Sequence, residues 1–322
     1  MEAAFAVIKK QEGHLYERPG EETGRNTSEL TDVLLSGWAV EILLREPYWL
    51  YVRTFYGYKG WIFREELQEI TKSCLESRQD PVRFCRIGAR SADLLAEPKV
   101  QGTILETLLR DSIVSKAGPD GAEAPAGNKK EKSPEGAAET APEGWTRIRS
   151  ASGAAGWVFS SQLAPRLDDD QFLLRQDPFW FLKKADLVRK SEKEEVLRER
   201  AAASALSYQG TSYRWGGKSP LGIDCSGLVF MSWLEQGILI YRDASIKAAY
   251  PVREIQREQL RKGDLIFFPG HVAMSLGGDR FIHATGHPSS PCVRINSLSP
   301  SDPGYRADLA GRVTRCGSLF GA

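Results

Sequence analysis

Short runs of alternating apolar and polar residues fill the first part of the chain. They include residues 33–35, 39–43 and 49–53. A glycine turn at residues 56–58 then leads to one more strand-like run, which begins near Trp61. Alternation with a period of two is typical of strands that bury one face. We therefore predict a small β-barrel over residues 13–68.

The same arrangement returns between residues 91 and 166. In each region a tryptophan lies in one strand-like run, and a glycine turn then leads to a second tryptophan twelve residues later. The pairs are Trp49 and Trp61, and Trp145 and Trp157. An internal repeat indicates two copies of one structural unit. We predict a second barrel over residues 91–166 and expect Trp61 and Trp157 in the barrel cores.

Two segments differ from the barrels in composition. Residues 118–144 consist largely of Ala, Gly, Pro, Glu and Lys. Such a composition cannot bury a core, so we predict a mobile insertion in a surface loop of the second barrel. Residues 168–200 are predicted to form a helical linker, with an amphipathic helix over residues 193–206. Residues 201–316 then form a third domain.

Composition limits the classes to which the chain can belong. Its 322 residues are too many for one ordinary domain, and 41% hydrophobic and 26% charged residues are typical of a globular protein. A net charge of +1 predicts no nucleic-acid partner, and no apolar run approaches the roughly 20 residues of a membrane span.

The N-terminus places an acidic residue before its first basic pair, the opposite of the order in a secretory signal. We expect a cytoplasmic protein if this N-terminus is native, and a periplasmic or extracellular one if a signal peptide was removed.

Cys225 stands out among five cysteines. An odd number without a Cys-x-x-Cys pair argues against a disulfide framework and a zinc ribbon. Cys225 follows a glycine-containing segment and precedes an apolar run, so we predict that it begins a helix. The positive helix end lowers the pKa of a thiol there, and backbone N–H groups can receive an oxyanion. The alternative is a buried, inert cysteine.

A nucleophilic thiol needs a base, and two of the four histidines lie downstream in strand-like runs. His271 and His283 are separated by the turn Gly277-Gly278-Asp279. Two antiparallel strands joined there would bring the imidazoles side by side, so that His271 acts as general base and His283 orients it. As an alternative, Cys225, His271 and His283 could bind zinc with water as the fourth ligand.

Five motifs follow one another in this region. They are Tyr213-x-Trp215-Gly216-Gly217, Asp224-Cys225-Ser226-Gly227-Leu228, Gly263-Asp264-Leu265-Ile266-Phe267-Phe268, Gly270-His271-Val272 and Phe281-Ile282-His283-Ala284. Together they resemble the signatures of the NlpC family of papain-like cell-wall peptidases. The resemblance implies an α+β domain in which Cys225 is the nucleophile, His271 the general base and His283 its orienting partner. It also implies that Tyr213 lies near the oxyanion site.

The predicted barrels resemble bacterial SH3-like domains, and two of them before such a domain is a layout similar to the γ-D-glutamyl-L-diamino acid endopeptidases. This implies hydrolysis of the bond to diaminopimelate or lysine in murein peptides with a free N-terminal L-Ala, without a metal or cofactor. The first barrel would close one end of the cleft. The residues implied to contact the substrate are Asp224, Ser226, Ser245 and Tyr58, with Tyr56 as the alternative to Tyr58.

Two positions depart from that group. The Gln that usually follows Asp243-Ala244-Ser245 is absent, and Ser212 stands where a proline usually precedes the motif tyrosine.

The alternative functions are a non-catalytic wall-binding protein and an amidase or acyltransferase of the same fold.

Overall fold

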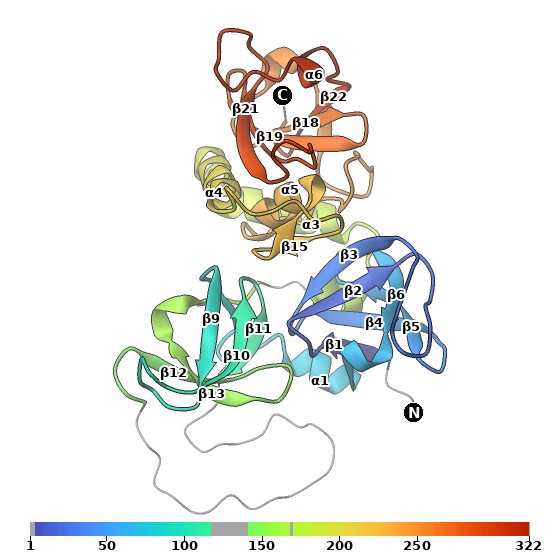
Figure 1. Ribbon diagram of the computed structural model, residues 1–322, viewed down its shortest axis with the longest axis vertical. Helices are drawn as coiled ribbons and strands as arrows, with labels where there is room; N and C mark the ends of the chain where they lie inside the picture. Colours follow the sequence, from blue (N-terminus) through green and yellow to red (C-terminus); the bar gives the residue numbers. More distant parts are fainter. Residues whose placement is uncertain (1–3, 117–140, 168–169, 322) are drawn as a thin grey trace, which may run out of the picture. The chain divides into compact units, whose positions relative to one another are not determined.

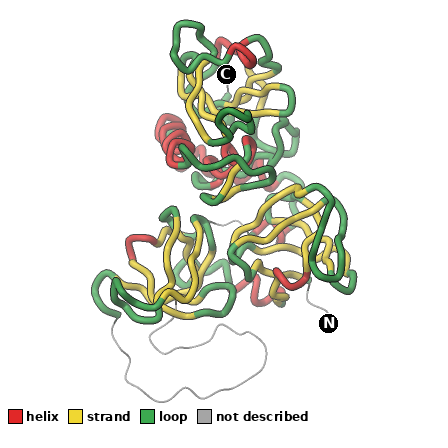
Figure 2. Tube along the Cα trace, in the orientation of Figure 1, coloured by secondary structure: helices red, strands yellow, loops and turns green. Residues whose placement is uncertain are grey.

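The computed structural model describes residues 4–116, 141–167 and 170–321 of the chain (Figure 1). It divides into two compact units, Met1–Leu174 and Arg175–Ala322. The first is built mainly from strands, whereas the second combines helices with a sheet (Figure 2). The predicted fold class, two small β-barrels followed by an α+β domain, is confirmed. Most of the predicted insertion, residues 118–140, lies outside the described residues.

The first unit contains two seven-stranded sheets, ordered β3-β2-β6-β5-β4-β1-β7 and β10-β9-β13-β12-β11-β8-β14. The strands of the first sheet are β1 (Phe5–Ile8), β2 (Glu12–Tyr16), β3 (Leu30–Leu35), β4 (Ala39–Arg45), β5 (Trp49–Thr54), β6 (Lys59–Phe63) and β7 (Leu67–Ile70). Those of the second are β8 (Phe84–Ile87), β9 (Ser91–Leu95), β10 (Ile104–Leu109), β11 (Ile113–Lys116), β12 (Trp145–Arg149), β13 (Ala155–Phe159) and β14 (Leu163–Pro165). Between and after the strands lie η1 (Arg64–Glu66), α1 (Lys72–Ser77), η2 (Ser160–Gln162) and α2 (Gln171–Arg175).

The two sheets confirm the internal repeat. Each strand of the first sheet has its counterpart seven strands later in the chain, at the same place in the order. Trp49 pairs with Phe63 across β5 and β6, and Trp145 pairs with Phe159 across β12 and β13. The ring centroids of these pairs lie 5.4 Å and 4.3 Å apart. The repeated sequence pattern therefore reflects a repeated aromatic contact between the same two strands.

The expectation that Trp61 and Trp157 fill the barrel cores is wrong. Both are only partly buried, whereas the residues after them, Ile62 and Val158, are 0% exposed. Neighbouring residues of a strand point to opposite faces, so the narrow barrel interior receives the smaller β-branched side chain. The indole of Trp61 lies on the other face, where it packs against Tyr51 with ring centroids 5.2 Å apart.

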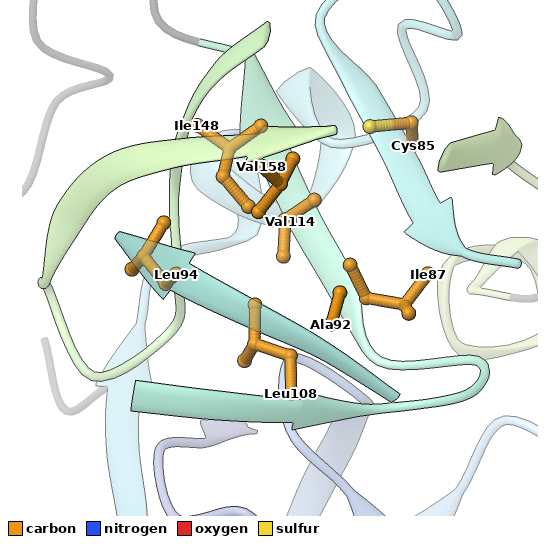
Figure 3. Packing of buried hydrophobic residues seen from close by; sticks show 8 residues of the cluster. All are labelled: Cys85, Ile87, Ala92, Leu94, Leu108, Val114, Ile148 and Val158. Carbon is orange, nitrogen blue, oxygen red and sulfur yellow. The ribbon is translucent and has the colours of Figure 1, made fainter. Parts of the chain in front are cut away.

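The core of the second barrel is a cluster of small and medium apolar side chains from strands β8 to β13 (Figure 3). Its members are Cys85, Ile87, Ala92, Leu94, Leu108, Val114, Ile148 and Val158. Cys85 is a free thiol, and burial raises its pKa. It therefore serves here as a small apolar side chain rather than as a reactive group.

The two barrels are joined by hydrogen bonds to backbone groups. The indole N–H of Trp38 donates to the carbonyl of Asp111 at 2.9 Å, and the amide of Ile113 donates to the carbonyl of Ser36 at 2.9 Å. Trp38 itself is 2% exposed, so this contact is shielded from water.

The second unit begins with helices α3 (Trp180–Ser191) and α4 (Glu194–Ser207), the latter over the predicted helical segment. The short strands β15 (Lys218–Ser219) and β16 (Gly222–Ile223) lead into helix α5 (Cys225–Leu234). A six-stranded sheet follows, in the order β17-β22-β18-β19-β20-β21. Its elements and their neighbours are β17 (Arg253–Ile255), η3 (Arg257–Gln259), β18 (Leu265–Phe268), β19 (His271–Gly277), β20 (Arg280–Ala284), β21 (Val293–Ser297), α6 (Ala307–Ala310) and β22 (Arg315–Ser318).

Helix α5 forms the interior of the second unit. All of its residues are buried, and it packs against α4 and against strands β19 and β20. A helix that is apolar all round is stable only when it is enclosed in this way. Arg198 on α4 helps to close the domain, because its guanidinium binds the Asp264 carboxylate at 2.8 Å and lies over the Phe320 ring at 4.6 Å.

Replacing a buried leucine of the second barrel should cost far more than replacing an exposed one on the same strand. On β10, Leu108 is 0% exposed and Leu105 is 46% exposed. We expect Leu108→Ala to lower the free energy of unfolding by about 2–5 kcal/mol because it leaves a cavity, and Leu105→Ala to change it by less than about 1 kcal/mol. Urea unfolding of the full chain measures both, and equal losses would contradict this description of the core.

Candidate active site

Cys225 is the first residue of helix α5, as predicted. Asp224 caps the helix in an extended conformation, and its carboxylate accepts the Gly227 N–H at 2.5 Å. Gly227 itself has no room for a side chain, because a Cβ there would lie 2.2 Å from the carbonyl oxygen of Gly217. The cap and this close approach together hold the nucleophile at the start of the helix.

The thiol of Cys225 is 6% exposed, and burial raises its pKa to about 11, with the Asp224 carboxylate adding to the shift. Hydrogen bonds from the backbone N–H groups of Val272 and Ser226 act in the opposite direction but are outweighed. The expectation of a lowered thiol pKa is therefore wrong. Removing a thiolate from water costs more than the helix end and two amides return. The resting thiol is protonated at neutral pH.

His271 and His283 lie together on neighbouring strands. The register that pairs Met274 with Ile282 places the two histidines diagonally on one face of β19 and β20. Their rings meet through His271 Nε2 and His283 Nδ1 at 2.8 Å. His283 Nε2 lies 3.0 Å from the side-chain oxygen of Asn296 on β21.

Both imidazoles are held in their neutral forms. Burial lowers the pKa of His271 to about 4, and the nearby Arg306 guanidinium contributes. Burial also lowers the pKa of His283 to about 3, followed by the effect of His271. Neutral His271 can accept a proton at pH 7, so it has the protonation state that a general base requires.

Tyr213 lies beside the nucleophile. Its backbone forms a parallel bridge with Ile223, two residues before Cys225. Burial raises the pKa of the Tyr213 phenol, and the charges of Cys225 and Asp224 raise it further. The hydroxyl therefore stays protonated and can donate a hydrogen bond next to the reacting sulfur.

An arginine that the sequence analysis missed organises the start of α5. Arg242 is 2% exposed, and its guanidinium donates hydrogen bonds to both oxygens of the Asp224 carboxylate, at 3.1 Å and 2.9 Å. It also donates to the Ser226 hydroxyl at 2.7 Å. The bidentate geometry makes this a strong charge-assisted contact. Arg242 directly precedes Asp243-Ala244-Ser245, and that position was the one available signal.

The predicted substrate contacts fall into three settings. Asp224 is committed to Arg242 and Gly227, so its binding of a substrate ammonium remains a prediction. Ser226 is 7% exposed and lies in the same network. Ser245 lines a small pocket with Val229, one turn beyond Cys225, and with Val272, next to His271. Ser245 thus lies near the elements that carry the nucleophile and the base.

The two candidate tyrosines of the first barrel differ in exposure. Tyr56 is 1% exposed, and its hydroxyl binds the buried carboxylate of Asp32 inside the barrel. Tyr58 is only partly buried and lies at the end of a turn, where its carbonyl accepts a hydrogen bond from the Thr54 amide. Tyr56 is therefore a core residue, and a contact of Tyr58 with substrate stays a prediction.

Among residues 4–116, 141–167 and 170–321, no group of three or more His, Cys, Asp and Glu side chains is placed to hold a metal ion. Within the same residues, no helix has both the length and the apolar character needed to cross a bilayer.

The arrangement is suited to acyl transfer through a covalent intermediate. A thiol lies at a helix N-terminus and meets the backbone N–H of Val272, the residue after His271, and the neutral imidazole of His271 contacts a second imidazole. A protonated phenol and backbone N–H groups at the start of the helix can stabilise negative charge on an oxygen.

Comparisons with known proteins agree with this geometry. The sequence profile of the NlpC/P60 family matches residues 210–305. A protein of Lysinibacillus sphaericus named dipeptidyl-peptidase 6 is 38% identical over 297 residues, which cover 91% of this chain and 93% of that protein. A γ-D-glutamyl-L-lysine dipeptidyl-peptidase of Bacillus cereus is 34% identical over 112 residues, or 32% of each chain.

A solved structure shares the fold over nearly the whole length. The crystal structure of an NlpC/P60 family protein from Bacillus cereus covers 98% of this chain and 100% of its own, with a TM-score of 0.66 and 18% sequence identity. At that identity the likeness concerns the fold alone.

The raised pKa of Cys225 predicts a steep pH dependence of its alkylation. Because only the thiolate reacts, the rate with iodoacetamide should rise about tenfold per pH unit between pH 7 and pH 10. Mass spectrometry of the peptide that contains Cys225 separates this reaction from those of the other cysteines. A plateau between pH 5 and pH 8 would instead reveal a preformed thiolate–imidazolium pair.

Proposed function

This chain belongs to the NlpC/P60 family, and we propose that it is a cysteine endopeptidase that hydrolyses the bond between γ-D-glutamate and an L-diamino acid in murein peptides. The observation that carries the proposal is the contact of His271 with His283 beside a cysteine that begins a buried helix. The names of the two relatives support the bond and the substrate class, since both are named dipeptidyl-peptidases and one is named for γ-D-glutamyl-L-lysine.

The first half of the reaction forms an acyl-enzyme. His271 takes the proton of Cys225, and the sulfur attacks the γ-carbonyl carbon of the glutamate residue. Negative charge moves to the carbonyl oxygen, where first-turn N–H groups of α5 and the Tyr213 hydroxyl can stabilise it. The C–N bond then breaks as protonated His271 gives its proton to the departing amine of the diamino acid. A thioester to Cys225 remains.

Water completes the cycle. His271, neutral again, takes a proton from a water molecule, whose oxygen attacks the thioester carbon. The C–S bond breaks, the sulfur regains a proton from His271, and the γ-carboxylate of the glutamyl product leaves. The low pKa of His271 leaves it unprotonated at neutral pH, and the imidazolium that it forms gives up its proton readily to the leaving group.

We further propose that the substrate carries a free N-terminal L-Ala. Release of a dipeptide, as in the names of both relatives, requires that the enzyme bind the amino end of the substrate two residues before the bond that it cleaves. Ser226, Ser245 and Tyr58 are the contacts proposed for that end of the substrate. Asp224 contributes its charge to this region, although Arg242 neutralises it in part.

A single peptide assay tests bond and amino end together. L-Ala-γ-D-Glu-diaminopimelate should yield the dipeptide L-Ala-D-Glu, detected by mass spectrometry. Acetylating the alanine nitrogen removes its charge and should lower kcat/KM by about 100-fold or more.

Two cysteine variants serve as controls for this assay. Cys225→Ala should abolish cleavage, whereas Cys74→Ala, at a partly buried free cysteine of the first unit, should leave it unchanged. Equal cleavage of the acetylated peptide would refute the requirement for a free amine. Cleavage by the Cys225→Ala variant would refute the cysteine mechanism.

A further inference from the structure

The contact between the two histidines continues to a third side chain. His283 Nε2 meets the side-chain oxygen of Asn296 at 3.0 Å, and the side-chain nitrogen of Asn296 donates to the carbonyl of Gly304 at 2.8 Å. His283 and Asn296 are 0% and 4% exposed. The series of hydrogen bonds from His271 through His283 and Asn296 therefore ends on a backbone carbonyl, and the last two side chains are almost fully buried.

The end of this chain fixes the direction of every hydrogen bond in it. A backbone carbonyl can only accept, so the NH₂ group of Asn296 faces Gly304 and its oxygen faces His283. That oxygen can also only accept, so His283 carries its proton on Nε2. In neutral His283 the other nitrogen, Nδ1, is then a lone pair.

The tautomer of His283 in turn fixes that of the catalytic histidine, His271. Since His283 Nδ1 accepts, His271 must donate from Nε2 at the 2.8 Å contact. Neutral His271 then has its lone pair on Nδ1, the nitrogen that remains for the proton of Cys225. With the opposite tautomer of His283, an N–H on Nδ1 would demand a lone pair on His271 Nε2 and leave His271 without a basic Nδ1.

A histidine in the third position of a catalytic triad is ambiguous by itself. A carboxylate or an amide oxygen only accepts, whereas an imidazole nitrogen donates or accepts according to its tautomer. A group beyond His283 must therefore decide which tautomer is present.

We propose that Asn296 is the positioning residue that fixes the tautomer of His283, and through it the tautomer of His271, so that the base presents Nδ1 to the nucleophile. The inference rests on the cysteine peptidase function proposed above. It assigns a role to a side chain that touches neither substrate nor sulfur.

Burial keeps both rings neutral, as the tautomer assignment requires, and the surrounding charges act in both directions. Arg306 lowers the pKa of both histidines and Arg294 that of His283, while Asp224 and Asp308 raise the pKa of His271. Arg306 is itself paired with Asp308 at 2.6 Å. Asn296 carries no charge, and its hydrogen bond raises the pKa of His283 only against the larger lowering effects of burial and of His271.

Two substitutions separate tautomer control from simple packing. Asn296→Leu keeps the branched shape of the side chain but cannot accept a hydrogen bond, and we expect kcat to fall about 10- to 100-fold with KM little changed. Asn296→Asp still accepts from His283, so kcat should stay within a few-fold of the wild type. Its negative charge favours the imidazolium, so the acid limb of kcat/KM should move to higher pH from its position near pH 4.

The matched control is Ser297→Ala, the next residue on β21. Ser297 is 1% exposed and its hydroxyl accepts the Ser299 amide, away from both histidines. This variant should keep wild-type kcat and the wild-type pH profile. A loss as large as that of Asn296→Leu would show that any polar deletion in this strand disturbs the site, and would overturn the proposal.

Nitrogen-15 NMR of the histidine rings gives a readout that needs no substrate. The chain has four histidines, so single His→Ala variants assign the signals. Wild-type His271 and His283 should both show protonated Nε2, and Asn296→Leu should lose this pattern while urea unfolding shows that it is folded. If Asn296→Leu does not fold, the pH shift of Asn296→Asp decides.

The outcomes distinguish this inference from the proposed function. Unchanged ring tautomers in Asn296→Leu, or an unshifted acid limb in Asn296→Asp, would overturn the role of Asn296 even if the peptide is cleaved. A wild-type chain that shows the expected tautomers but cleaves no murein peptide would refute the function and leave the positioning role standing.

Discussion

Burial of helix α5 is the constraint on which the active site depends. The helix is apolar on every side, so the second unit must enclose it, and its first residue is Cys225. Enclosure raises the pKa of the thiol and lowers the pKa values of His271 and His283. The resting site is thus an uncharged pair of proton donor and acceptor. Charge separation must be stabilised by a bound substrate rather than stored in the free enzyme.

The same burial explains why so many groups converge on the first turn of α5. A carboxylate at the helix cap would be costly to enclose alone, and the Arg242 guanidinium offsets that cost with a bidentate contact. The Ser226 hydroxyl joins the pair and becomes oriented by it. The buried histidines need no counter-ion, because neutral hydrogen bonds that end at the Gly304 carbonyl pair their ring nitrogens.

The first unit is organised differently, because it contains two copies of one small β-barrel. Its two sheets share a strand order, and the paired aromatic residues on β5 and β6 recur on β12 and β13. The two copies have diverged where they meet. Trp38 of the first copy donates to a backbone carbonyl of the second, which ties the barrels together by a buried contact.

Local spacing determined much of this protein. The internal repeat, the helix that begins at Cys225 and the hairpin with His271 and His283 were predictable from residue patterns along the chain. The α+β class of the third domain followed from the resemblance of its five motifs to a known family. Tertiary structure decided what depends on distant partners. Arg242 meets Asp224 from 18 residues away, and Asn296 meets His283 from 13. The face on which Trp61 lies, and the net direction of the thiol pKa, depend on which surfaces pack together and how completely water is removed. Sequence periodicity carries no measure of either.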